Sequence, residues 1–81
     1  MTNQELITLL LDNKIEQFNK FRREHQDATI DLSNANFMGS NLTRANLSGV
    51  ILYNAKLIGA KINKEQVAML PELLGIEVIE D

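Results

Sequence analysis

The chain has 81 residues, of which 44% are hydrophobic and 23% charged, with no cysteine, one histidine and a formal net charge of −3. This length allows one small domain, and the ordinary balance of hydrophobic and charged residues argues against full disorder. The absence of cysteine excludes disulfides and disfavours a structural zinc site, so an unusually regular core or a partner must stabilise the fold.

Charge is distributed unevenly along the sequence. Residues 1–29 carry a net charge of −1, residues 30–64 carry +3 and residues 65–81 carry −5. No apolar run approaches the roughly 18 residues of a transmembrane helix, and the first residues lack the basic start of a secretory signal. We therefore expect no membrane insertion and a cytoplasmic location.

The first 29 residues predict two helices, over 3–11 and 14–25. Thr2 and Glu5 have the spacing of a capping box, in which each residue satisfies a free backbone N–H of the other. The second segment places its large apolar residues on one face and its charged residues on the other. This pair of helices is expected to fold back over the segment that follows.

Residues 30–64 divide into seven units of five residues, and the third place of every unit is large and apolar. The third-place residues are Leu32, Phe37, Leu42, Leu47, Leu52, Leu57 and Ile62. A period of five fits neither the helix nor the strand, so the backbone must turn once per unit to point each of these side chains inward. Glycine in the fifth place of every second unit, at 39, 49 and 59, fits such a turn, and the other fifth places are expected to use a turn type that tolerates a side chain.

The units resemble those of the pentapeptide-repeat family, whose unit is roughly A(N/D)Lxx. ANLSG at 45–49 matches that unit in full, and ANFMG at 35–39 matches with Phe in place of Leu. The resemblance implies a mainly β fold, a short right-handed quadrilateral β-helix (a pentapeptide-repeat solenoid) of under two coils with α-helical caps at both ends. Four units would form one coil, so residues twenty apart would stack on each other.

The last 17 residues predict a second cap. Asn63 and Gln66 can cap a short helix over 64–70, which Pro71 interrupts, and a short strand is predicted over 76–79 from its alternating apolar residues. Repeat arrays need capped ends because the last coil otherwise exposes its apolar interior.

The organisation predicted from these elements is a single domain over 1–81. It consists of a helical N-terminal cap over 1–29, seven pentapeptide repeats over 30–64, and a C-terminal cap with a short helix and strand over 65–81.

The sequence indicates no enzyme, no cofactor and no metal site. His25 is the only histidine, and it falls near a predicted helix end without a neighbouring nucleophile. Lys20, Arg22 and Arg23 are interspersed with acidic residues, so we expect a solvated helix face there and no binding of nucleic acid.

Five residues on the outer surface of the repeats are candidates for binding a protein partner: Arg44, Ile51, Tyr53, Lys56 and Ile58. Ile51 replaces the usual Asn or Asp of the second place, and the fourth places of Tyr53 and Ile58 face outward in the family. Met38 also occupies a fourth place, fifteen residues before Tyr53, which itself lies five before Ile58, so we expect these three on different sides or at neighbouring corners. The apolar candidates can equally pack against a cap, and the basic ones can be ordinary solvated surface.

These features favour a non-enzymatic protein–protein interaction or assembly module, such as an accessory subunit of a larger complex. Family members that resemble this chain are abundant in photosynthetic bacteria. The alternative is the DNA-mimic type of pentapeptide-repeat protein that binds gyrase, but that type is long and acidic, whereas residues 30–64 are short and carry +3. A homodimer through the strand over 76–79 or through a cap is a further possibility.

Overall fold

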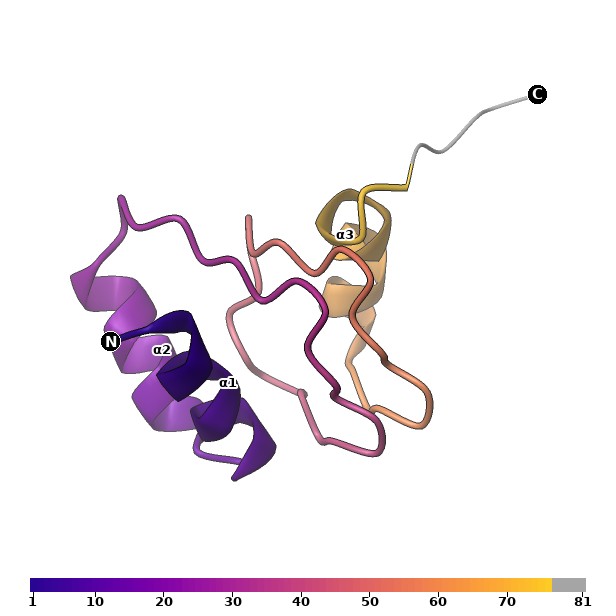
Figure 1. The fold of residues 1–81 in the computed structure, drawn as a ribbon, viewed down its shortest axis with the longest axis horizontal. Helices are drawn as coiled ribbons and strands as arrows, with labels where there is room; N and C mark the ends of the chain where they lie inside the picture. Colours follow the sequence, from indigo (N-terminus) through magenta and orange to yellow (C-terminus); the bar gives the residue numbers. More distant parts are fainter. Residues whose placement is uncertain (77–81) are drawn as a thin grey trace.

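Two short helices lie against one end of an irregular coil, and a third helix lies at its other end (Figure 1). In this computed structural model, which describes residues 1–76, α1 spans Asn3–Leu11, α2 spans Ile15–Glu24 and α3 spans Lys64–Leu73. The chain between α2 and α3 contains no helix and winds back alongside itself.

The helix α1 begins as the sequence predicts. The Thr2 hydroxyl accepts the Glu5 N–H at 3.1 Å, and the Glu5 carboxylate accepts the Thr2 N–H at 3.0 Å. The hydrogen bond from the Thr2 backbone N–H is the main cause that lowers the pKa of the Glu5 carboxyl from its ordinary value. Leu6 and Leu10, one helical turn apart, are both buried, so α1 presents one apolar stripe to the core.

The repeats turn at the end of every unit and return to the same side after four units. Parallel bridges join Asp31 to Ile51, Asn36 to Lys56 and Asn41 to Lys61, and each pair is twenty residues apart. We name the four sides of this coil by their residues: side A is 30–34 and 50–54, side B is 35–39 and 55–59, side C is 40–44 and 60–63, and side D is 45–49. Residues 30–49 are the first coil, and residues 50–63 are the second.

Every fifth-place residue of the coil adopts the left-handed conformation. The fifth-place φ angles lie between 61° and 73° in Asn34, Gly39, Arg44, Gly49, Asn54 and Gly59. The expectation that the non-glycine fifth places use another turn type is therefore wrong. Asn enters this region at small cost, whereas Arg44 does so at a cost of roughly 1–2 kcal/mol relative to a glycine.

The expectation of a mainly β fold is also wrong. The described residues contain three helices of nine, ten and ten residues, and their only inter-strand pairing consists of isolated bridges. A turn at every fifth residue leaves each side too short for two successive bridges, so no β-strand or sheet forms. The described chain is therefore helical at both ends and irregular between them. The strand predicted over 76–79 lies, apart from Ile76, outside the described residues.

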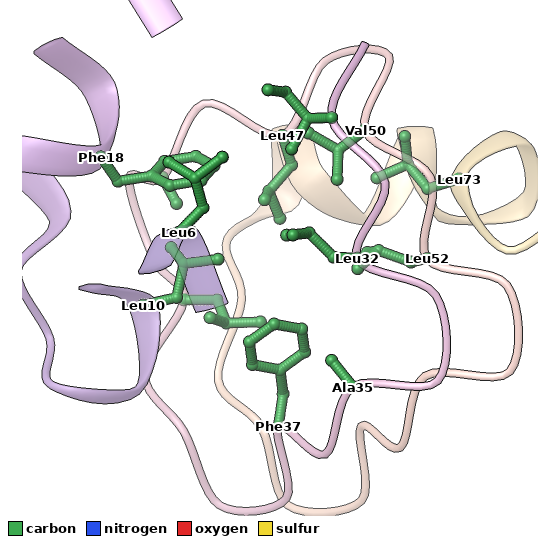
Figure 2. Packing of buried hydrophobic residues seen from close by; sticks show 13 residues of the cluster. Leu6, Leu10, Phe18, Leu32, Ala35, Phe37, Leu47, Val50, Leu52 and Leu73 are labelled. Carbon is green, nitrogen blue, oxygen red and sulfur yellow. The ribbon is translucent and has the colours of Figure 1, made fainter. Parts of the chain in front are cut away.

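One hydrophobic cluster joins the helices to the coil (Figure 2). Its thirteen buried members are Leu6, Leu10, Phe18, Ile30, Leu32, Ala35, Phe37, Leu42, Ala45, Leu47, Val50, Leu52 and Leu73. The first five third-place residues are all buried, as the period of five predicts. Burying a large apolar side chain contributes about 1.5–3 kcal/mol, so these residues dominate the stability of the coil.

A side-chain amide connects α2 to side D of the coil. The Asn19 Oδ1 accepts the Asn46 N–H at 2.7 Å, and the Asn19 Nδ2 donates to the Arg44 carbonyl at 2.9 Å. Arg22 also donates to the Ser48 carbonyl, and desolvation lowers the pKa of its guanidinium. No coil precedes side D, so these side chains of α2 bond backbone groups whose equivalents in the second coil bond the first coil.

The helix α3 lies over sides D and A at the end of the coil that follows the second coil. Asn63 and Gln66 form the predicted capping box, and the Gln66 Nε2 also donates to the Leu42 and Ala45 carbonyls at 2.6 and 3.0 Å. At the end of α3, the Leu73 carbonyl accepts the Leu52 N–H at 2.8 Å.

The prediction that Pro71 interrupts the helix is wrong. Pro71 lies inside the last turn of α3, which continues to Leu73. Proline removes one helical hydrogen bond. The burial of Leu73 and its bond to the coil hold this turn in place.

Candidate docking surface

An exposed apolar pair lies on side B of the coil. Met38 and Ile58 occupy the fourth places of the two stacked units, and their side chains are 51% and 76% exposed. The Gly39 N–H donates to the Ile58 carbonyl at 3.0 Å and joins the two turns. Isolated exposed apolar residues are common on protein surfaces, but neighbouring ones form a patch that can anchor a partner.

The expectation that Met38 and Ile58 lie on different sides is wrong. The two residues are twenty positions apart, the same interval that separates the bridged pairs. Sequence reasoning missed the pair because it compared each residue with Tyr53. The interval of twenty is itself the signal that identifies stacked residues.

Two lysines flank this pair on the second coil. Lys56 and Lys61 are exposed second-place residues of sides B and C, and each is bridged to an asparagine of the first coil. Among residues 1–76, no ion pair involves either lysine. We call Met38, Lys56, Ile58 and Lys61 the basic–apolar surface. It offers two positive charges beside an aliphatic patch.

The five candidate residues predicted from the sequence do not form one patch. Lys56 and Ile58 belong to the basic–apolar surface. Arg44 is exposed at the end of side C in the first coil, and its carbonyl accepts the hydrogen bond from Asn19 of α2. Arg44 therefore holds the N-terminal helices through its backbone, away from the side that carries Ile58.

The two remaining candidates, Ile51 and Tyr53, lie on side A. Ile51 is partly buried and bridged to Asp31. Tyr53 is 48% exposed, and its ring packs against Gly75, where an added Cβ would come within 2.9 Å of the ring. Tyr53 thus contacts the turn after α3, which is the cap-packing alternative.

A family model shows what kind of repeats these are. The model for pentapeptide repeats (8 copies) matches residues 30–64. Residues 30–64 are pentapeptide repeats. The matched range holds the seven units that the sequence predicts, and the resemblance is confirmed. No curated protein and no solved structure matched the chain significantly.

Pentapeptide repeats are typical of protein-interaction or structural modules, and their family is generally non-enzymatic. In the part of the chain that the structure describes, no three acidic or histidine side chains gather to hold a metal ion. None of its three helices within residues 1–76 has the length and hydropathy of a membrane span.

Proposed function

We propose that this pentapeptide-repeat protein is an accessory docking module that binds an acidic partner protein through its basic–apolar surface. The observation that carries the proposal is the stacking of Met38 and Ile58, both more than half exposed, beside the exposed Lys56. The interior of the first coil is filled with large apolar side chains, so the repeats present their outer sides to a partner.

Charge supports an acidic partner. Residues 30–64 carry four basic residues and one acidic residue, and Lys56 and Lys61 point from adjoining sides of the second coil. Oppositely charged surfaces speed association and fix the orientation of the partner. The aliphatic pair between these charges favours a protein over a nucleic acid, because a phosphate backbone offers no apolar group to cover it.

The DNA-mimic alternative has less support. Mimicry of duplex DNA requires an acidic outer surface, whereas the two adjoining sides B and C carry Lys56 and Lys61. The coil also has only two layers.

Binding experiments with a pair of matched variants test the proposal. Ile58→Asp alters the surface, whereas Leu11→Asp changes an aliphatic residue that is 47% exposed in α1, at the opposite end of the coil. We expect proteins captured by the wild-type chain in its native cells to be retained by Leu11→Asp and reduced at least tenfold by Ile58→Asp. The same ranking is expected when a captured partner is purified and titrated directly.

Two results would overturn the proposed function. One is equal capture by Ile58→Asp and the wild type, provided that thermal melts show that Ile58→Asp and Leu11→Asp are both folded. The other is a captured species that is nucleic acid and disappears on nuclease treatment.

A further inference from the structure

The end of the coil next to α3 has an open backbone edge on sides B and C. In the first coil, the N–H groups of Phe37 and Leu42 donate at 2.8 and 2.9 Å to carbonyls of the second coil. The equivalent N–H groups of the second coil belong to Leu57 and Ile62, and neither has an acceptor within residues 1–76. Because no backbone carbonyl of α3 accepts an N–H from sides B and C, these donors form a parallel edge that no described residue pairs.

A small apolar cavity opens beside this edge. Its volume is about 120 Å³, and Leu57, Ile62 and Leu70 of α3 contribute to its lining. Leu57 and Ile62 are the two third-place residues that are only partly buried. An apolar cavity of roughly 150 Å³ accepts a benzene-sized group, so this one has room for a single aliphatic side chain.

The lysines of the basic–apolar surface stand at matching positions along the edge. Lys56 immediately precedes Leu57, and Lys61 immediately precedes Ile62. Consider a parallel segment added to this edge in register with the second coil. The residue of that segment that faces a lysine is followed in sequence by the residue that lies over the cavity. A carboxylate followed by an aliphatic side chain complements both positions, because directly opposed opposite charges stabilise a strand pair.

The opposite end of the coil lacks this combination. The N–H groups of Asn36 and Asn41 are also without acceptors within residues 1–76. The interior there is filled by Leu10 of α1 and Phe18 of α2, which are 1% and 0% exposed. An added segment would therefore gain backbone hydrogen bonds at that end but no apolar burial.

We propose that the edge formed by residues 55–62 binds an extended segment of the acidic partner, parallel to this edge, in which an acidic residue immediately precedes an aliphatic one. This inference rests on the proposed function and specifies how the partner is recognised. The partner segment continues the coil by one layer on sides B and C. Its backbone carbonyls accept the N–H groups of Leu57 and Ile62, and its aliphatic side chain fills the cavity.

The test uses the full chain and a synthetic decapeptide built from two acidic units, acetyl-Ala-Glu-Leu-Ser-Gly-Ala-Glu-Leu-Ser-Gly-amide. Its glutamates are five residues apart, like Lys56 and Lys61. We expect saturable binding, with amide hydrogen exchange at Leu57 and Ile62 slowed at least tenfold. A peptide with lysine in place of both glutamates is expected to bind at least tenfold more weakly.

A charge exchange separates edge recognition from general attraction. The Lys56→Glu/Lys61→Glu variant is expected to lose the acidic peptide and to bind the lysine peptide instead. The matched control reverses the charge of Lys20 and Arg23 on α2, and it is expected to keep the acidic peptide with less than a twofold change. Thermal melts check that both variants are folded.

Four outcomes would overturn the inference. The first is no binding at millimolar peptide. The second is binding that shifts the resonances of Met38 and Ile58 without slowing exchange at Leu57 and Ile62, which leaves the proposed function standing. The third is slow exchange at Leu57 and Ile62 in the dilute free protein, which would assign the edge to the chain itself. The fourth is protection that appears only as the protein is concentrated, which would assign the edge to a second copy.

Discussion

The first and second coils follow the same path, but their turns are supported differently. In each unit of the first coil, a second-place side-chain oxygen accepts the backbone N–H two residues later, at 3.0–3.3 Å. These acceptors are Asp31, Asn36, Asn41 and Asn46. Such bonds hold a turn locally. The second coil has Ile51, Lys56 and Lys61 in the same places, and none of these side chains can accept such a bond.

The two coils also differ in burial. The third-place residues of the first coil are 0–1% exposed, whereas Leu57 and Ile62 of the second coil are partly exposed. The difference follows from the caps. Two helices close the first end, and α3 leaves sides B and C of the second end uncovered. The first coil is therefore the scaffold, and the second coil carries the groups available to a partner.

The largest expected effect comes from placing a charge in each coil. Leu47→Asp buries an unpaired carboxylate in the filled interior, at a cost of several kcal/mol, against a total stability of about 5–15 kcal/mol for a domain. We expect Leu47→Asp to unfold the chain and Leu57→Asp to remain folded, because its carboxylate can reach water through the open end. Circular dichroism melts distinguish the two. A Leu47→Asp variant that melts cooperatively near the wild-type temperature would contradict the inward placement of the third-place residues.

A smaller effect is expected from the side chains that support the turns. Asn41→Ala removes the acceptor of the Thr43 N–H and should reduce the free energy of unfolding by about 0.5–1.5 kcal/mol. Lys61→Ala, twenty residues later, should change it by less than about 0.5 kcal/mol. Urea denaturation measures both. Equal losses in the two variants would mean that the turns of the coils are supported alike.

The smallest effect concerns acid stability. Hydrogen bonds from the Ser33 hydroxyl and backbone N–H lower the pKa of Asp31 in the folded chain. The folded state therefore binds this proton less readily than the unfolded state. Its contribution to stability is present above the unfolded pKa, about 3.9, and is lost as the pH falls through the lowered folded value. Asp31→Asn keeps the turn without the charge.

Thermal melts between pH 7 and pH 2.5 should therefore show a larger loss of stability in the wild type than in Asp31→Asn. Identical pH profiles for the two proteins would show that the hydrogen bonds of the turn do not lower the pKa of Asp31.

Local patterns predicted several elements correctly. The capping boxes at Thr2 and Asn63 marked both helix starts, and the five-residue period identified the buried third-place residues. The mainly β expectation failed because a family's fold was carried over to a coil whose sides are too short for strands. Pro71 misled for a different reason. Tertiary contacts, namely the burial of Leu73 and the hydrogen bond from the Leu52 N–H to its carbonyl, hold the turn that contains the proline.

The candidate surface was only partly predictable. Lys56 and Ile58 could be chosen from their residue types and their places in the repeat unit. Their proximity to Met38 could be recognised only from the register in which the two coils stack. The roles of Tyr53 and Arg44 depended on contacts with Gly75 and Asn19, which lie far away in the sequence. The open edge could not be predicted because it depends on where α3 crosses the coil.

The most direct test of the difference between the coils is residue-specific amide hydrogen exchange in the free protein. The Phe37 N–H donates to the second coil, whereas the Leu57 N–H has no acceptor within residues 1–76. The account predicts that the amide of Phe37 exchanges at least a hundredfold more slowly than that of Leu57. Comparable exchange rates at Phe37 and Leu57 would contradict the division into a closed first coil and an open second one.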